Sequence, residues 1–226
     1  MTIELDSVEL NFKNRRILYG VYLKAETGSI VGLLGRNGSG KSCLLQILFG
    51  SLQAKYKFIK RNGKPLLKPL YAEGKSVYLP QHDLAPGQLK ISTLFKLLRL
   101  DWNTFVDYFE NFSHYYNSKL QTLSGGERRV VETYVVLKQQ SAIILLDEPF
   151  SNIAPLYVEK MKQLIVAEKQ TKAIIITDHY YQDVIDICDT LYLLRNGCTK
   201  KIDDIKELED SHYLHTGTFK TKKGGH

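Results

Sequence analysis

The chain contains 226 residues, carries a formal net charge of +7 and has three cysteines. This length can bury one large core without disulfides. Cys43, Cys188 and Cys198 form neither a CxxC pair nor a metal-ligand cluster, so we expect reduced cytosolic thiols. The first six residues lack the basic start and apolar block of a signal peptide, and no apolar stretch approaches the roughly 18 residues of a membrane-spanning helix. A membrane role is therefore expected only through a partner.

The first strong motif lies at residues 35–42, which have the spacing G-x-x-x-x-G-K-S. An apolar strand candidate at 30–34 precedes it and a helical pattern at 42–49 follows, which is the context of a phosphate-binding loop. The glycines let successive N–H groups point inward, and the helix N-terminus adds positive charge. Lys41 can reach the terminal phosphates and the Ser42 hydroxyl suits Mg²⁺, so we predict nucleoside triphosphate binding. The loop residues are Gly35, Arg36, Asn37, Gly38, Ser39, Gly40, Lys41 and Ser42.

A basic segment follows at 55–75, where seven lysines and arginines face the single acid Glu73. Asn62 and Gly63 within it form a strong hairpin-turn signal between two short apolar stretches. Two interpretations stay open: the basic side chains face solvent on a hairpin, or they meet lipid head groups. The segment lacks the interleaved aromatic platform of nucleic-acid-binding modules, so no direct nucleic-acid partner is expected.

Further along the chain, short apolar runs alternate with helical patterns. Such alternation predicts an α/β fold whose mainly parallel sheet is covered by helices. Besides the run at 30–34, the predicted strands lie at 76–79, 143–146, 173–177 and 190–194, and the predicted helices lie at 125–140 and 155–169.

The segment from about 90 to 120 differs from this alternation. Asp101 is a candidate helix N-cap, and aromatic side chains then recur at steps of three and four residues. We predict an inserted helical lobe at about 85–140 in a single domain, 1–226, with a fraying polar tail at 215–226. The aromatic stripe is either internal packing or a binding face. It consists of Trp102, Phe105, Tyr108, Phe109, Phe112, Tyr115 and Tyr116.

A second motif, LSGGE at 123–127, stands at the start of a helical pattern. Ser124 and Glu127 have the spacing of a capping box. Capping does not require the two glycines between them, which lower helix stability. They do leave the helix N-terminus bare for close approach by a phosphate. We expect the motif both to cap the helix and to bind a phosphate.

Two carboxylates, Asp147 and Glu148, follow the apolar strand at 143–146. Ligands of open α/β sheets bind at the carboxyl ends of the strands. A purely structural role for both acids is disfavoured, because a buried pair of like charges raises a pKa and lowers stability. We therefore place both in the nucleotide site.

Together these motifs resemble the ATP-binding cassette family over nearly the whole chain. The phosphate loop, the LSGGE string and the strand-ending DEP string occur in the family's order. Gln81 and His179, each after a predicted strand, resemble the Q-loop glutamine and the switch histidine, and Phe12 resembles the A-loop aromatic. The DEPF and ITDH strings are most similar to cassettes of lipopolysaccharide-export and branched-chain amino-acid transporters.

The resemblance implies a P-loop NTPase core with a small antiparallel β lobe beside the inserted helical lobe. It also implies a head-to-tail dimer with a second copy or a paralogous cassette, each ATP lying between the phosphate loop of one copy and the LSGGE string of the other. Phe12 would stack on adenine, Glu148 would orient the attacking water, and His179 would contact the γ-phosphate. Positioning and charge neutralisation then supply most of the rate. The implied sites are Glu148, His179 and Gln81 for catalysis, Ser42, Gln81 and, through water, Asp147 for Mg²⁺, and Phe12, Cys43, Ser124, Gly125 and Gly126 beside the phosphate loop for ATP.

Three departures from the family pattern matter. Cys43 stands where a second hydroxyl residue is usual, which removes a hydrogen-bond donor for the α-phosphate. Ala154 stands where the D-loop normally has an aspartate that helps couple the two sites, so hydrolysis is expected to be slow or dependent on the partner. Only 83 positions separate Lys41 from Ser124, which implies a compact cassette without the long coiled-coil insertions of chromosome-maintenance relatives.

We therefore predict the soluble ATPase subunit of a transporter whose membrane subunits are separate chains, located at the cytoplasmic face of the membrane. A cassette ATPase acting on a ribosomal, cluster-assembly or cell-division complex is the alternative. A low-turnover ATP switch is a third interpretation, which Ala154 motivates.

Overall fold

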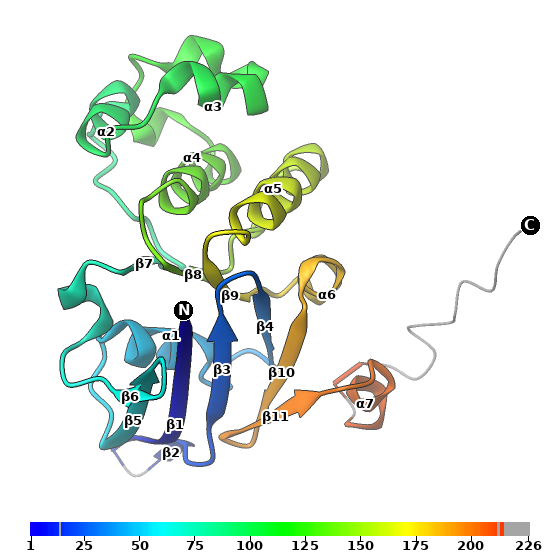
Figure 1. The fold of residues 1–226 in the computed structure, drawn as a ribbon. Helices are drawn as coiled ribbons and strands as arrows, with labels where there is room; N and C mark the ends of the chain where they lie inside the picture. Colours follow the sequence, from blue (N-terminus) through cyan, green and yellow to red (C-terminus); the bar gives the residue numbers. More distant parts are fainter. Residues whose placement is uncertain (14, 212, 215–226) are drawn as a thin grey trace, which may run out of the picture.

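The computed structural model describes residues 1–13, 15–211 and 213–214. A mainly parallel sheet with its helices, a smaller antiparallel sheet and a helical lobe make up the fold, with the helical lobe at the top of Figure 1. The predicted α/β fold with an antiparallel lobe and an inserted helical lobe is thereby confirmed. The predicted fraying of 215–226 lies outside the described residues.

The larger sheet has the strand order β11-β10-β4-β9-β8-β7, in which β10 to β7 run parallel and β11 joins antiparallel. Strands β4, β8 and β9 are buried at every position, because other layers cover both faces of the sheet. The five predicted strands all form. They are β4 (Ile30–Leu34), β7 (Ser76–Leu79), β8 (Ile143–Asp147), β9 (Ala173–Thr177) and β10 (Thr190–Arg195), and β11 (Cys198–Ile202) follows them.

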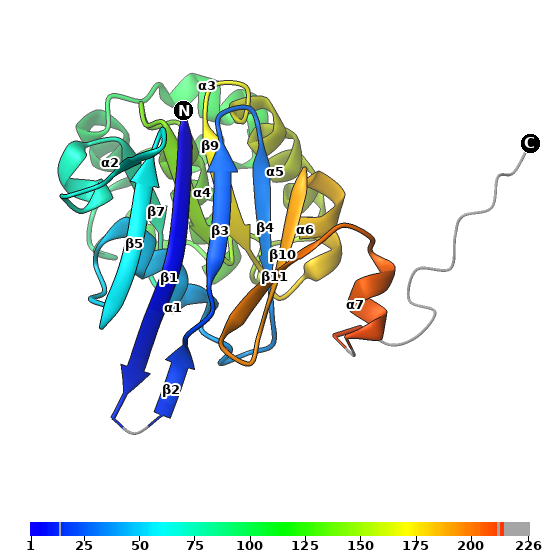
Figure 2. The same ribbon diagram turned by 60° about the horizontal axis from the view of Figure 1, so that its bottom comes forward.

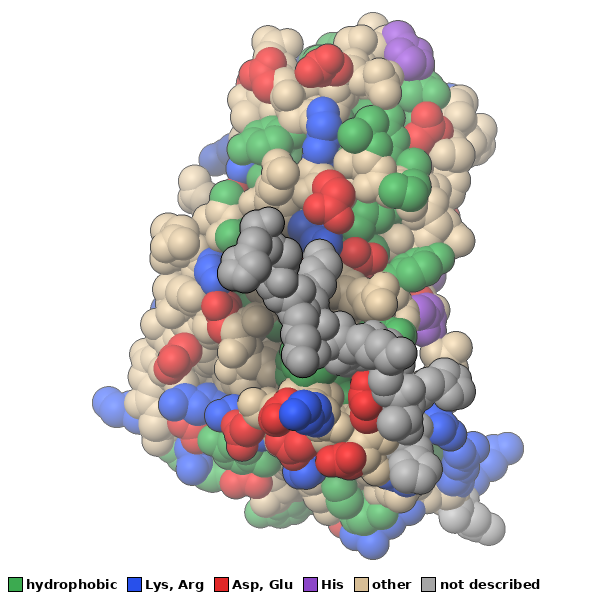
Figure 3. All heavy atoms as spheres, turned by 90° about the vertical axis from the view of Figure 1, so that its right-hand side faces the viewer, with side chains coloured by type: hydrophobic (Ala, Val, Ile, Leu, Met, Phe, Trp, Pro, Cys, Tyr) green, Lys and Arg blue, Asp and Glu red, His purple; other side chains and the backbone are tan. Residues whose placement is uncertain are grey.

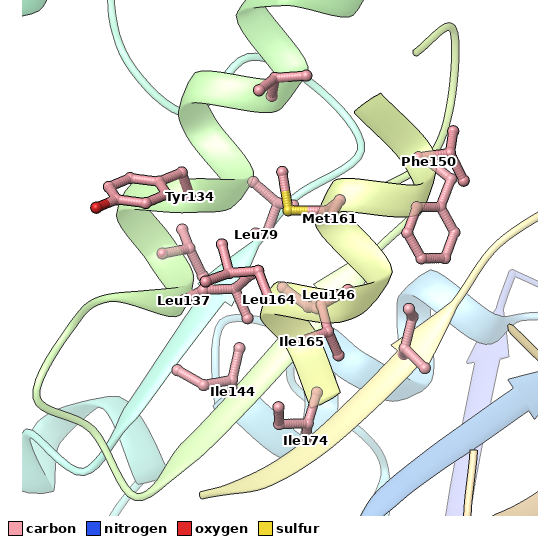
Figure 4. Packing of buried hydrophobic residues seen from close by; sticks show 14 of the residues in the cluster. Leu79, Tyr134, Leu137, Ile144, Leu146, Phe150, Met161, Leu164, Ile165 and Ile174 are labelled. Atoms are coloured by element: carbon pink, nitrogen blue, oxygen red, sulfur yellow. The ribbon is translucent and has the colours of Figure 1, made fainter. Parts of the chain in front are cut away.

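Two hydrophobic cores lie on the two faces of this sheet. Because side chains alternate along a strand, Ile144 and Leu146 pack in the core with α4 and α5, whereas Leu145 packs in the core with α1. Figure 4 shows Tyr134 of α4 and Met161 of α5 in the first core. The helices are α1 (Lys41–Phe49), α4 (Gly125–Leu137), α5 (Pro155–Glu168), α6 (Tyr181–Ile187) and α7 (Lys206–Asp210).

The antiparallel sheet covers the core around α1. Its long strand β1 pairs with β2, β3 and β5, and Figure 2 shows β5, β1 and β3 side by side. Asn62 and Gly63 both have positive φ, 48° and 73°, as the predicted tight hairpin turn requires. The strands are β1 (Thr2–Phe12), β2 (Arg15–Leu18), β3 (Tyr22–Glu26), β5 (Tyr56–Arg61) and β6 (Lys64–Pro65), and η1 (Leu70–Glu73) leads on to β7.

The helical lobe contains the predicted aromatic stripe. Asp101 caps α3, its carboxylate accepting a hydrogen bond from the Thr104 N–H at 2.7 Å. Phe105 is buried and its ring centroid lies 4.8 Å from that of Tyr134 in α4, so internal packing is the correct interpretation for the centre of the stripe. The periodicity does not continue as one helix, because Phe109 leaves helical geometry at φ −131°. The lobe comprises α2 (Ile91–Leu97), α3 (Trp102–Tyr108), η2 (Glu110–Tyr115) and η3 (Leu120–Thr122).

The N-cap residue of α5 gives the helix no side-chain cap. Ala154 occupies the N-cap position directly before Pro155, and its methyl group cannot accept a hydrogen bond from the first amides of the helix. Ala154 is exposed. The departure from the family's aspartate therefore also removes a good helix cap.

We expect Ala154→Asp to stabilise the fold by about 1 kcal/mol, because the carboxylate can cap the amides of α5 and favours the positive end of the helix. Denaturant titration would measure the change in the free energy of unfolding. Ala154→Asn is the matched control, since it offers the same cap without the charge. A loss of stability in both variants would show that this loop cannot accept a cap.

Candidate nucleotide-binding site

The glycine-rich loop connects β4 to α1 and curls over the helix N-terminus. Gly40, the N-cap of α1, has φ +105°, which side chains rarely adopt. A Cβ at Gly40 would also lie 3.0 Å from Ile17 and 3.1 Å from Leu18. The conformation and the close approach of β2 together require glycine here.

Lys41 closes the loop from inside. Its ammonium donates hydrogen bonds to the carbonyl oxygens of Gly35 at 2.7 Å and Arg36 at 3.4 Å. Burial lowers the pKa of Lys41, and the negative charges of Glu148 and Asp147 oppose this lowering. The lysine therefore lies at the phosphate loop and next to the carboxylates that were predicted to share the site.

Two of the three predicted Mg²⁺ ligands, Ser42 and Asp147, lie side by side. The Ser42 hydroxyl donates to Asp147 Oδ1 at 3.1 Å, and the Tyr78 hydroxyl donates to Asp147 Oδ2 at 2.9 Å. Asp147 is 1% exposed, and burial raises the pKa of its carboxyl although both hydroxyl bonds lower it. Hydroxyl and carboxylate oxygens are ligands that Mg²⁺ accepts, and phosphates and water would supply the remaining ligands. This donor set fits the predicted metal.

Three predicted residues from three separate loops meet at Glu148. Gln81 Nε2 donates to Glu148 Oε2 at 2.9 Å, and His179 Nε2 lies 2.7 Å from Glu148 Oε1. Glu148 has φ +57°, an uncommon conformation for a side chain of this size, and its N–H donates to the Thr177 carbonyl at 2.7 Å. Strained backbone of this kind is often found at functional sites. The turn aims the carboxylate toward Gln81 and His179.

An open pocket of about 470 Å³ lies between the phosphate loop, Glu148 and His179. Phe12 forms part of its wall and is 48% exposed, so its ring is accessible to a nucleobase. Burial raises the pKa of the neighbouring Cys43 thiol, which keeps it protonated. The lining residues are Phe12, Ile17, Asn37, Gly38, Gly40, Lys41, Ser42, Cys43, Gln81, Glu148 and His179. The structure therefore brings together the predicted residues from the A-loop, phosphate loop, Q-loop and switch histidine.

Ser124, Gly125 and Gly126 do not line this pocket. The capping box is formed: Ser124 Oγ accepts from the Glu127 N–H at 3.2 Å, and Glu127 Oε2 accepts from the Ser124 N–H at 2.8 Å. A Cβ at Gly126 would lie 2.1 Å from the Asn152 carbonyl oxygen, so packing alone requires that glycine. A Cβ at Gly125 would meet nothing within 4 Å. Packing within the chain therefore does not explain the glycine at position 125.

Arg129, which the sequence motifs did not identify, ties α4 to the site. Its guanidinium donates to the carbonyls of Glu148 at 3.0 Å, Pro80 at 2.7 Å and Asp147. The side chain is 7% exposed, and burial lowers its pKa. The available signal was a charged residue at the start of an otherwise apolar helix face. Tyr78 was missed as well, because no motif marks a tyrosine on a predicted strand.

Comparison with known proteins identifies the family. The ABC transporter family matches residues 18–151, more than half of the chain. This chain belongs to the ABC transporter family. It is thus an ATP-binding cassette with ATPase activity.

Relatives match this cassette over most of its length. It is 29% identical over 208 residues to the lipopolysaccharide export system ATP-binding protein LptB of Haemophilus influenzae, covering 85% of this chain and 86% of LptB. It is 28% identical over 218 residues to the ABC transporter ATP-binding protein YtrB of Bacillus subtilis, covering 93% of this chain and 74% of YtrB. A solved ATP-binding subunit of an ABC transporter superposes with a TM-score of 0.78 at 19% identity, covering 96% of this chain and 95% of that one. This last likeness supports the fold.

We expect Arg129→Lys to lower kcat for ATP by about tenfold to 100-fold, because a lysine keeps the charge but cannot hold three carbonyls in one plane. KM should change much less, since the phosphate loop is untouched. Steady-state kinetics would separate the two constants, and thermal unfolding would report folding. Arg128→Lys is the matched control, because Arg128 pairs with Asp83 and Glu132 instead. Equal losses in both variants would rule out a positioning role for Arg129.

Proposed function

We propose that this cassette is the ATP-hydrolysing subunit of a transporter and that it works as a head-to-tail dimer. The observation that carries the proposal is the separation within one chain of the phosphate pocket and the bare start of α4. The pocket has residues for adenine, phosphates, metal and water, yet Ser124 and Gly125 do not line it. A second copy or a paralogous cassette would supply the missing helix N-terminus.

In this proposal the phosphate loop and Lys41 bind the β- and γ-phosphates, and the Phe12 ring stacks on adenine. The Lys41 ammonium exchanges its bonds to the loop carbonyls for bonds to phosphate oxygens. Ser42, Gln81 and, through water, Asp147 would hold Mg²⁺, which when bound neutralises phosphate charge. Tyr78 keeps the Asp147 carboxylate oriented through its hydroxyl bond.

Glu148 orients and polarises the attacking water, and Gln81 and His179 hold its carboxylate. Both contacts lie within hydrogen-bonding distance, at 2.9 and 2.7 Å. Ser151 adds a third contact to the same carboxylate at 3.2 Å. Phosphoryl transfer depends mainly on such positioning and on charge stabilisation, so this group of side chains suffices without a covalent nucleophile.

The partner's Ser124, Gly125 and Gly126 would close the site over the γ-phosphate. The α4 N-terminus offers unpaired amides and the positive end of the helix dipole. Gly125 is exposed, and nothing in its own chain would contact a Cβ there. ATP would thereby hold the two copies together, and hydrolysis would release them.

Transport is supported by the relatives, one of which is an ATP-binding protein of a lipopolysaccharide export system. Among the described residues, no helix is both long and apolar enough to cross a membrane. We place the cassette at the cytoplasmic face of a membrane, bound to separate membrane subunits. Ala154 favours a second candidate, a low-turnover ATP switch, because the D-loop lacks its usual acid. The turnover of the unaltered chain distinguishes the two.

Glu148→Gln tests the catalytic carboxylate, because it keeps shape and hydrogen bonding but removes the charge that orients water. We expect retained ATP binding, turnover lower by about 100-fold or more, and an ATP-stabilised dimer on gel filtration. Glu110→Gln, at an exposed glutamate on the helical lobe, is the matched control. Undiminished turnover in the Glu148 variant would remove that residue from its assigned role.

Ser124→Arg tests the shared site. A bulky cation at the start of α4 should leave nucleotide binding by the monomer intact while abolishing ATP-driven dimerisation and hydrolysis. Ser124→Ala removes the hydroxyl without adding bulk or charge, so we expect a loss of about 1 kcal/mol of stability and a weakened but retained dimer, because the amides of α4 stay accessible. Nucleotide affinity and oligomeric state would be measured for both. Loss of monomer binding in the arginine variant would contradict a contact in trans.

A further inference from the structure

The segment at 55–75, here called the basic lobe, carries positive charge that the fold does not neutralise. It spans β5, β6 and η1, the cyan part at the lower left of Figure 1. Lys55 pairs with Glu9 at 3.1 Å, and Arg61 pairs with Glu73. Its other lysines form no ion pair with any described residue. They are Lys57, Lys60, Lys64, Lys68 and Lys75.

A leucine stands exposed among these charges. Leu67 is 95% exposed, between Lys64 and Lys68, which are also exposed. Its neighbours serve the fold: the Leu66 N–H donates to the Ile59 carbonyl at 2.8 Å. Leu67 packs into neither hydrophobic core. Folding therefore does not explain an apolar side chain at this position.

The nucleotide site does not explain the charge. The basic lobe is attached at the far end of α1, where the ring centroids of Phe49 and Tyr71 lie 5.6 Å apart and a Cβ added at Gly50 would lie 2.5 Å from Pro69. The phosphate loop precedes Lys41 at the other end of this helix, about 13 Å away at 1.5 Å per residue. On the face bearing α7, by contrast, acidic and basic side chains lie interspersed (Figure 3).

We propose that the basic lobe binds the surface of an anionic membrane, with Leu67 entering the head-group layer. Lysines near such a surface are attracted by its negative potential, and their long stems keep the charge at the interface while apolar neighbours go deeper. Tyr71, half exposed next to this surface, belongs to a residue type enriched at membrane interfaces. The contact needs neither dimerisation nor ATP turnover, so it stands apart from the proposed function.

The test is co-sedimentation of the full chain with vesicles, without nucleotide. One set contains phosphatidylcholine alone and the other equal parts of phosphatidylcholine and phosphatidylglycerol. We expect binding to the anionic vesicles only, weakened by salt because the attraction is screened. Lys64→Ala/Lys68→Ala should weaken it by about 25-fold, at roughly fivefold for each lysine. Leu67→Ser should reduce the binding that survives at high salt.

Lys96→Ala/Lys206→Ala is the matched control, since it removes two exposed lysines of other elements that form no ion pair with a described residue. It should bind vesicles as the unaltered chain does. Equal weakening in the control would reduce the effect to net charge and overturn the proposal. Absence of binding to anionic vesicles would overturn it as well. Tighter binding to duplex DNA than to anionic vesicles at the same salt concentration would also overturn it, because it would indicate a nucleic-acid surface. ATPase activity of the variants reports folding and is expected to be unchanged.

Discussion

The site depends on one buried guanidinium. Arg129 reaches from α4 to the carbonyls at the ends of β7 and β8, and so fixes the two segments that carry Gln81 and Glu148. A buried charge without partners strongly destabilises a fold, but three carbonyl acceptors satisfy this one. The Arg129 guanidinium can therefore be buried only if these two loops place their carbonyl groups around it. The same helix begins within the LSGGE string, so a displacement of α4 would also shift the Glu148 carboxylate.

The negative charges around this arginine are held in place by similar contacts. Asp178 accepts hydrogen bonds from the backbone N–H of Phe150 at 2.7 Å and of Tyr180 at 3.1 Å. This carboxylate thereby joins the loop after β8 to the loop after β9, which places His179 beside Glu148. Burial raises the pKa of Asp178, as it does for Asp147. Lys41 and Arg129 supply the nearby positive charge that favours both carboxylates in their ionised form.

Packing against another loop constrains the first turn of α4. Gly126 is needed because the Asn152 carbonyl oxygen leaves no room for a side chain. The D-loop, residues 151–155, and the LSGGE string are therefore in direct contact within one chain. If a partner displaced Gly125, the contact between Gly126 and Asn152 would transmit the displacement to the D-loop. Helix propensity alone marks these glycines as destabilising. It cannot reveal that Gly126 has no room for a side chain, because that limit comes from Asn152 in another loop.

Elements whose chemistry is local could be predicted from the sequence. Spacing identified the phosphate loop, alternation identified the parallel strands, and the capping box and the hairpin turn at Asn62 followed from adjacent residues. The meeting of Gln81, Glu148 and His179 was implied by family resemblance, and the contacts between them exist only because parallel strands end at one edge of the sheet. The bonds of Arg129 and Tyr78 and the exposure of Leu67 were decided by tertiary structure alone, since each depends on residues far away in the chain that no local pattern specifies.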